Sequence, residues 1–212
     1  MQKEEYSKLF VIMCAISITL LLVSNIVAIK TIAIFGFIFA AADIIFPLTY
    51  VFGDVFTEVY GYKKAKFVIW LSFFCNLIMV ILFNIAIAIP GSAEFTGQEA
   101  MEAILGSTPR ILLASFLAYL VGNLTNSLVM SKLKQKTKGK YLALRTITST
   151  IVGEGLDTLI FVPIVFWGIL EFSSILNMIL SVFLIKVLFE VILTPVTYKV
   201  VAFVKEKENI QN

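Results

Sequence analysis

FPLTYVFGDVFTEVYGYKKAK, residues 46–66, decides the fold of this chain, because it sets two carboxylates in an otherwise apolar stretch. Asp54 and Glu58 are four residues apart, and side chains at this spacing share one face of a helix. The stretch ends in three lysines: Lys63, Lys64 and Lys66. An apolar helix that ends in lysines is typical of a transmembrane helix that reaches the cytoplasmic side. We therefore predict a spanning helix here, containing two acids that require an explanation.

The composition of the 212-residue chain is that of an integral membrane protein. Hydrophobic residues make up 59% and charged residues 15%, whereas soluble domains are about 45–50% apolar and about 25% charged. Histidine is absent, and the two cysteines, Cys14 and Cys75, both lie in apolar runs. This excludes His-based catalysis and the commonest zinc, copper and iron sites. We expect no metal, no cofactor and no enzymatic activity.

Six apolar segments predict an all-α protein with a single domain of six transmembrane helices over residues 1–212. The predicted helices cover about 9–29, 40–60, 67–89, 110–131, 147–169 and 174–203. The first is long enough to span and to remain in the mature protein rather than be cleaved as a signal peptide. The last is longer than a bilayer requires, and Pro195 is expected to bend or end it.

Two connections between these helices have distinctive sequences. Residues 31–42 are apolar but contain Gly36 and begin with β-branched residues. This pattern favours an extended element, although helix, strand and loop all stay open for this segment. Residues 90–110 carry glycine, serine, proline and three glutamates, and they predict a polar loop with one short amphipathic helix.

Lysine and arginine distribute unequally between the two sides of the predicted bundle. Fourteen of the 17 lie in the N-terminus, the second and fourth connections and the tail, whereas only Lys30 and Arg110 lie on the opposite side. This asymmetry predicts that both termini are cytoplasmic. The lysine-rich loop at 132–140 is interpreted as solvated and in contact with anionic headgroups. Nucleic-acid binding is the less favoured alternative, because no aromatic residues are interleaved with the lysines.

Six ionisable side chains fall within or near the membrane depth of the predicted helices. A charge near the bilayer centre costs about 2.5–3.5 kcal/mol on insertion scales, so such residues face the bundle interior and indicate function. At about 1.5 Å per helical residue, Asp157 and Lys186 both come close to the midplane, and we expect them to approach each other. Glu58 is close enough to the lysines to be an end residue whose side chain reaches the interface. The six are Asp54, Glu58, Glu154, Asp157, Lys186 and Glu190.

The deep charges predict a polar substrate site in the middle of the bundle. Lys186 and Asp157 alone could be structural, holding two helices together. Four deep carboxylates face this one cation, however, so some must be protonated, hydrated or matched to a ligand. Neither a metalloprotease HExxH motif nor a Gly-rich phosphate loop is present, which favours a carrier over an intramembrane enzyme. The expected substrate-binding residues are Asp54, Asp157, Lys186, Glu154, Glu190, Asn25, Asn123, Asn126, Phe46 and Tyr50.

Several of these stretches resemble the queuosine precursor transporter family, of the vitamin-uptake-transporter class. The matching pieces cover most of the predicted helices in order. They are SNIVAIK (24–30), the opening stretch at 46–66, RILLASFLAYLVGNLTN (110–126), GEGLDTLIFVPIVFWG (153–168) and IKVLFEVILTPV (185–196). By this resemblance, Asp54, Asp157 and Lys186 match the intramembrane polar positions of the family.

The resemblance implies an importer in the inner membrane for 7-cyano-7-deazaguanine, its aminomethyl derivative or queuine, which are salvaged to make queuosine in tRNA. It implies a fold similar to the six-helix substrate-binding subunits of energy-coupling-factor transporters, working without an ATPase module. Two alternatives stay open: a substrate-binding subunit that docks to a shared energising module, and a structural or regulatory membrane protein. The preferred base, the coupling ion and homo-oligomerisation also stay open. The excess of carboxylates slightly favours a cationic substituent or a coupling proton.

Overall fold

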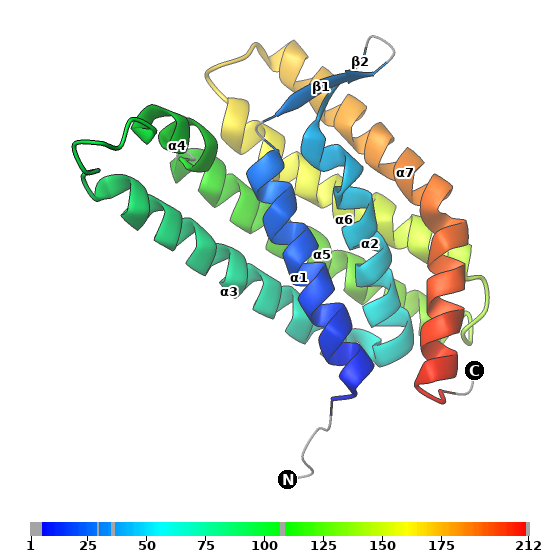
Figure 1. Ribbon diagram of the computed structural model, residues 1–212. Helices are drawn as coiled ribbons and strands as arrows, with labels where there is room; N and C mark the ends of the chain where they lie inside the picture. Colours follow the sequence, from blue (N-terminus) through cyan, green and yellow to red (C-terminus); the bar gives the residue numbers. More distant parts are fainter. Residues whose placement is uncertain (1–5, 29, 35–36, 107–108, 211–212) are drawn as a thin grey trace.

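The computed structural model describes residues 6–28, 30–34, 37–106 and 109–210, and it is built of helices with one short β-hairpin. The long helices are α1 (Lys8–Val27), α3 (Gly61–Ala88), α5 (Pro109–Lys136), α6 (Leu142–Phe166) and α7 (Phe172–Lys207). The shorter elements are β1 (Thr31–Ile34), β2 (Phe37–Ala40), the 3-10 turn η1 (Ala41–Ile44), α2 (Phe46–Val55), the π-helical turn η2 (Phe56–Tyr60) and α4 (Gln98–Leu105). The helical class of the prediction is confirmed (Figure 1).

Among the described residues, five helical segments are long and apolar enough to cross a membrane: α1, Leu48–Ala88, a segment within Gln98–Lys136, α6 and α7. The sequence predicts six, and the difference lies in α2 and η2. Their ten and five residues join α3 in a single run. The chain nevertheless changes direction at Gly61, where φ is 81°, a conformation that glycine adopts without steric cost. As a result, α2 and α3 diverge from this point as two arms (Figure 1).

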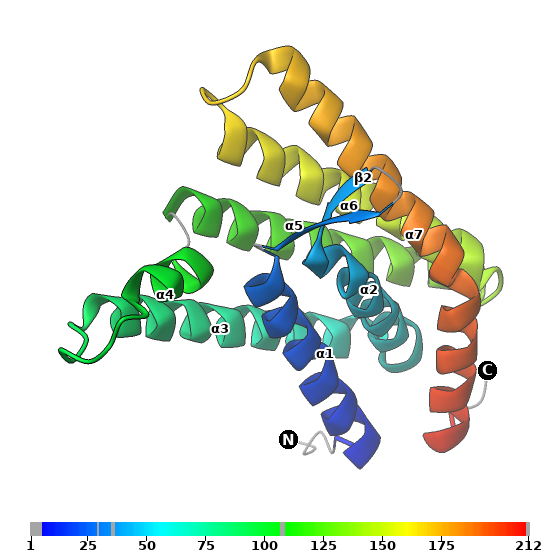
Figure 2. The same ribbon diagram turned by 45° about the horizontal axis from the view of Figure 1, so that its top comes forward.

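The two connections with distinctive sequences, residues 31–42 and 90–110, adopt the structures that their sequence patterns favour. Residues Thr31 to Ile34 pair antiparallel with Phe37 to Ala40, so the segment after α1 is an extended hairpin. The polar connection between α3 and α5 contains the short helix α4, as predicted. Figure 2 shows α4 beside the far end of α3. Neither element interrupts the long helices that form the bundle.

The described ends of the chain meet at one end of the bundle. The Ser7 hydroxyl, which precedes α1, donates a hydrogen bond to the Glu208 carboxylate, which follows α7. Helix α7 continues through Pro195 without ending there, and the ribbon changes direction along its length (Figures 1 and 2). A proline inside a helix removes one backbone hydrogen bond and commonly produces such a bend. The sequence predicted that Pro195 would either bend or end this helix. The helix bends and does not end at Pro195.

An apolar core at this same end packs the helices that carry the charged residues. Phe10 of α1, Phe56 of η2, Met130 of α5 and Val204 of α7 are all buried in one cluster. Aromatic edges add to it, since the Phe10 and Phe56 rings meet edge-to-face with centroids 5.5 Å apart. This core fixes α2 and η2 against α7 and thereby sets the positions of the acids on both.

Helices α5 and α6 lie side by side (Figure 2). They approach closely because two glycines, Gly122 and Gly153, face each other across their contact. A Cβ atom at Gly153 would lie 2.6 Å from the Cβ of Asn126 and 2.8 Å from the carbonyl oxygen of Gly122. A Cβ atom at Gly122 would lie 2.9 Å from the Cβ of Asp157. Small residues at such contacts let transmembrane helices pack backbone to backbone. The same contact therefore positions Asn126 and Asp157.

Replacing Gly153 by alanine is expected to separate α5 from α6 and to destabilise the protein by about 1–3 kcal/mol, because the new methyl group meets backbone that cannot yield. Thermal unfolding in detergent measures the loss. Gly155→Ala is the matched control on the same helix, because its Cβ would lie 3.5 Å from the Phe183 ring, an ordinary contact. Equal melting temperatures for both variants would contradict the close approach.

Candidate functional site

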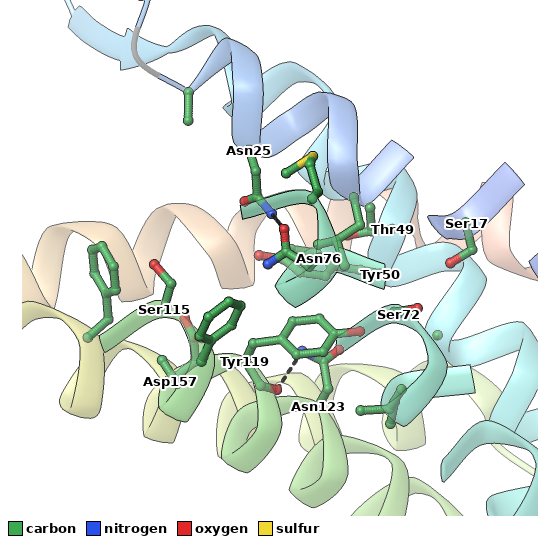
Figure 3. Close-up of a pocket in the computed structure, with 18 of the residues that line it drawn as sticks. Ser17, Asn25, Thr49, Tyr50, Ser72, Asn76, Ser115, Tyr119, Asn123 and Asp157 are labelled. Atoms are coloured by element: carbon green, nitrogen blue, oxygen red, sulfur yellow. Dashed lines mark hydrogen bonds between the residues drawn. The ribbon is translucent and has the colours of Figure 1, made fainter. Parts of the chain in front are cut away.

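A cavity of about 650 Å³ lies between α1, α2, α3, α5, α6 and α7. Its volume falls in the range of about 300–1,000 Å³ that is typical of small-molecule sites. Phenylalanines form much of the apolar wall: Phe83, Phe116, Phe161 and Phe189. Polar side chains enter it from every one of these helices: Ser17, Asn25, Thr49, Tyr50, Ser72, Asn76, Ser115, Tyr119, Asn123, Ser127, Glu154, Asp157 and Lys186. Figure 3 shows part of this lining, including Asn25, Tyr50 and Asp157.

Lys186 of α7 is the centre of an ion-pair cluster in the cavity wall. Its ammonium group lies 2.9 Å from a carboxylate oxygen of Glu154 and also pairs with Asp157, both on α6. The Tyr50 hydroxyl of α2 donates a hydrogen bond to Glu154 over 3.3 Å. The predicted approach of Asp157 and Lys186 is thus confirmed, and Glu154 joins the pair. Two carboxylates face one cation here, so the wall keeps acceptor capacity for a ligand.

Asparagine amides form another part of the lining. The Asn25 amide of α1 donates a hydrogen bond of 2.9 Å to the Asn76 side chain of α3. The Asn123 amide donates to the Tyr119 carbonyl of its own helix. Both bonds are visible in Figure 3. Asn25 and Asn123 were predicted as site residues, and the structure places both in the cavity lining.

Several lining residues were missed because they are small or aromatic rather than charged. The missed residues Ser115, Tyr119 and Ser127 lie at intervals of four along α5 together with Asn123, which was predicted, and all four line the cavity. Residues at this spacing share one helix face. A polar stripe of this length within an apolar helix is therefore the signal that would have identified them.

Three other predicted site residues lie outside this lining. Asp54 of α2 is 1% exposed and Glu190 of α7 is 2% exposed, so both are enclosed. They lie within hydrogen-bonding reach of each other, with Asn126 of α5 beside them. None of the three is among the described residues that line the cavity. The side chain of Phe46, the remaining predicted residue, lies outside the part of the structure that is described.

The sequence suggested that Glu58 is an end residue whose side chain reaches the membrane interface. The structure shows that this prediction is wrong. It is 1% exposed and pairs with Arg145, which is equally enclosed. Lys134 and Lys205 lie 3.5 Å from its other oxygen. The π-helical turn and the reversal at Gly61 direct Glu58 inward against α5, α6 and α7. Arg145 is correspondingly buried rather than part of the solvated loop.

Comparison with known proteins relates the chain to a family of transporters. A family model described as "Putative vitamin uptake transporter" matches residues 40–200. The chain is 28% identical over 176 residues to a "Probable queuosine precursor transporter" of Bacillus subtilis (strain 168), covering 82% of this chain and 77% of the relative. It is 28% identical over 122 residues to a protein of the same description from Haemophilus influenzae (strain ATCC 51907 / DSM 11121 / KW20 / Rd), covering 58% of this chain and 49% of that protein. No solved structure matches.

Proposed function

Because the chain belongs to the family described as "Putative vitamin uptake transporter", we propose that it imports queuosine precursors across the inner membrane. The family is one of membrane transporters rather than enzymes. Two relatives described as queuosine precursor transporters support the substrate class. The observation that carries the proposal is the cluster of Lys186, Glu154, Asp157 and Tyr50 in the wall of the cavity.

The cluster has the hydrogen-bonding pattern that a 7-deazaguanine base requires. One edge of such a base presents a carbonyl acceptor at position 6 and two parallel donors, N1–H and the 2-amino group. A carboxylate accepts two parallel donors in a fork geometry, and Glu154 or Asp157 supplies it while the other stays with Lys186. The Lys186 ammonium donates to the base carbonyl. Phe116, Phe161 and Phe189 form the apolar walls for the flat ring.

The proposed topology has six membrane crossings, with both termini in the cytoplasm and this site inside the bundle. In this proposal α2 and η2 form the short sixth span, and the Lys186 cluster lies near the bilayer midplane. The hydrogen bond between Ser7 and Glu208 supports a topology in which both described chain ends lie on one side of the membrane. Lys134, Lys205 and the lysine-rich loop after α5 lie at that same end of the bundle (Figure 1). The excess of positive charge at this end supports a cytoplasmic location for it.

The proposal is tested in a strain that cannot synthesise queuosine. Cells that express the chain are fed labelled 7-cyano-7-deazaguanine, its aminomethyl derivative or queuine, and queuosine in tRNA is then measured. Queuosine is expected to appear with at least one base in the absence of any ATPase module. If it appears only when such a module is co-expressed, the chain is a substrate-binding subunit instead. No queuosine under either condition contradicts import of these bases.

A further inference from the structure

Four helices converge on the enclosed pair formed by Asp54 and Glu190. Asp54 comes from α2 and Glu190 from α7, with Asn126 of α5 within reach of Asp54. Thr146 and Thr150 of α6 lie within reach of Glu190. Within the described part of the chain, neither oxygen of Asp54 has a hydrogen-bond partner. Glu190 Oε1 and Asn126 Oδ1 are likewise buried without one. Each of these atoms, as placed, is an acceptor, and none of them receives a hydrogen bond from a described residue.

The neighbouring cations are committed to other acids. Lys186, one turn along α7 from Glu190, pairs with Glu154 and Asp157. The other charged neighbour of Asp54 is Glu58, whose carboxylate is held by Arg145, Lys134 and Lys205. Glu190 also has the carboxylate of Glu154 as a charged neighbour. The pair therefore faces acids on η2 and α6, and none of the ion pairs between described residues includes Asp54 or Glu190.

A single proton is the ligand that this pair fits. Two carboxylates in contact away from water cannot both ionise, and they hold one proton between them. That proton supplies a hydrogen-bond donor to these acceptors. A hydrated metal ion would need open space and several ligands, yet neither acid lines the cavity. No group of three or more His, Cys, Asp or Glu side chains suited to a metal occurs among the described residues.

The pair is placed to sense whether the cavity is occupied. Gly53, the residue before Asp54, lines the cavity. Glu154 interacts electrostatically with Glu190 and is ion-paired to Lys186. A ligand that engages Glu154 or Lys186 changes the field at Glu190, and by reciprocity a proton on the pair changes the affinity for the ligand.

We propose that Asp54 and Glu190 form the proton site of a proton-coupled importer, with one proton bound from outside and released inside for each base. The identity of the transported base rests on the proposed function. The proton site depends only on the two acids, Asp54 and Glu190. In this proposal the base binds at the Lys186 cluster in the cavity wall. The proton binds between Asp54 and Glu190, and Glu190 lies one turn along α7 from Lys186.

Purified full-length protein in proteoliposomes tests the coupling. An inward proton gradient is expected to drive accumulation of the labelled base, and a sodium gradient at equal pH on both sides is not. Asp54→Asn and Glu190→Gln are expected to keep exchange of labelled for unlabelled base, because an amide mimics the neutral acid. Both should lose gradient-driven accumulation, by roughly 5-fold or more if a typical coupling free energy is lost. Glu99→Gln, in the exposed loop helix α4, is the matched control and should accumulate normally.

Infrared spectroscopy of the same protein separates the two proposals. The shared proton should give a carbonyl stretching band of a protonated carboxylic acid at neutral pH, and each of the two variants should lose or shift it. This readout does not require the substrate. Absence of the band, accumulation driven by sodium, or variants that accumulate like the unaltered protein would each overturn the proton site. Absence of exchange with every base, while the band is present, would overturn the substrate assignment alone.

Discussion

Lys186→Met is expected to reduce uptake of the base by roughly 10- to 100-fold, because a hydrogen bond to a charged group contributes about 1.5–3 kcal/mol. The ammonium group is the only described cation in the cavity lining, so its removal leaves the Glu154 and Asp157 carboxylates facing each other. It also removes the donor for the base carbonyl. Uptake is measured as initial rate per molecule of membrane-inserted protein, so a loss of insertion does not imitate a loss of transport.

Two further variants sharpen this test. Lys199→Met changes a lysine on the exposed part of the same helix and is expected to transport at the normal rate. Asp157→Asn keeps the ion pair between Lys186 and Glu154, so a loss of transport in this variant indicates that the second carboxylate serves the ligand. If Lys186→Met and Asp157→Asn both insert and transport at the unaltered rate, the cavity cluster is not the substrate site.

Depth along the helices was predictable from the sequence, and this is why the pairing of Lys186 with Asp157 was found. Counting residues from each membrane boundary places both side chains at one level, and the opposite charges then select the partner. Rotation about the helix axis was not predictable in the same way. Asp54 and Glu190 therefore could not be separated from the cavity lining by counting. Only the packing of α2 against α7 turns these two acids away from it.

The environment of Glu58 shows a second limit of the sequence. The apolar run and the lysines after it identified a spanning segment that ends at about residue 60. They gave no sign that the last turn is π-helical, and this turn rotates Glu58 toward the bundle. The basic partner is 87 residues away in the chain, and Arg145 had every feature of a loop cation. Long-range ion pairs of this kind depend on which helices become neighbours, which hydropathy does not determine.

Arg145→Met is expected to cause the largest loss of stability, about 3–5 kcal/mol, because it leaves the buried Glu58 carboxylate without its enclosed partner. The Arg145 guanidinium also donates hydrogen bonds of 3.0 Å to the carbonyl oxygens of Lys140 and Gly139. The variant therefore also loses the contacts that hold the turn between α5 and α6. Thermal unfolding in detergent and the yield of monodisperse protein measure the effect. Lys136→Met, at an exposed position in the last turn of α5, is the matched control and should melt normally.

The double variant Arg145→Met/Glu58→Leu decides whether the cost arises from the unpaired charge. When both ions of a buried pair are replaced by apolar side chains, the protein commonly recovers most of the loss, whereas removal of one ion leaves the other uncompensated. The double variant is therefore expected to melt well above Arg145→Met, and Glu58→Gln, which keeps the shape and a hydrogen-bonding oxygen, should lie between Arg145→Met and the unaltered protein. If the double variant is as unstable as Arg145→Met, the stability comes from the carbonyl contacts of Arg145 in the turn rather than from its pairing with Glu58.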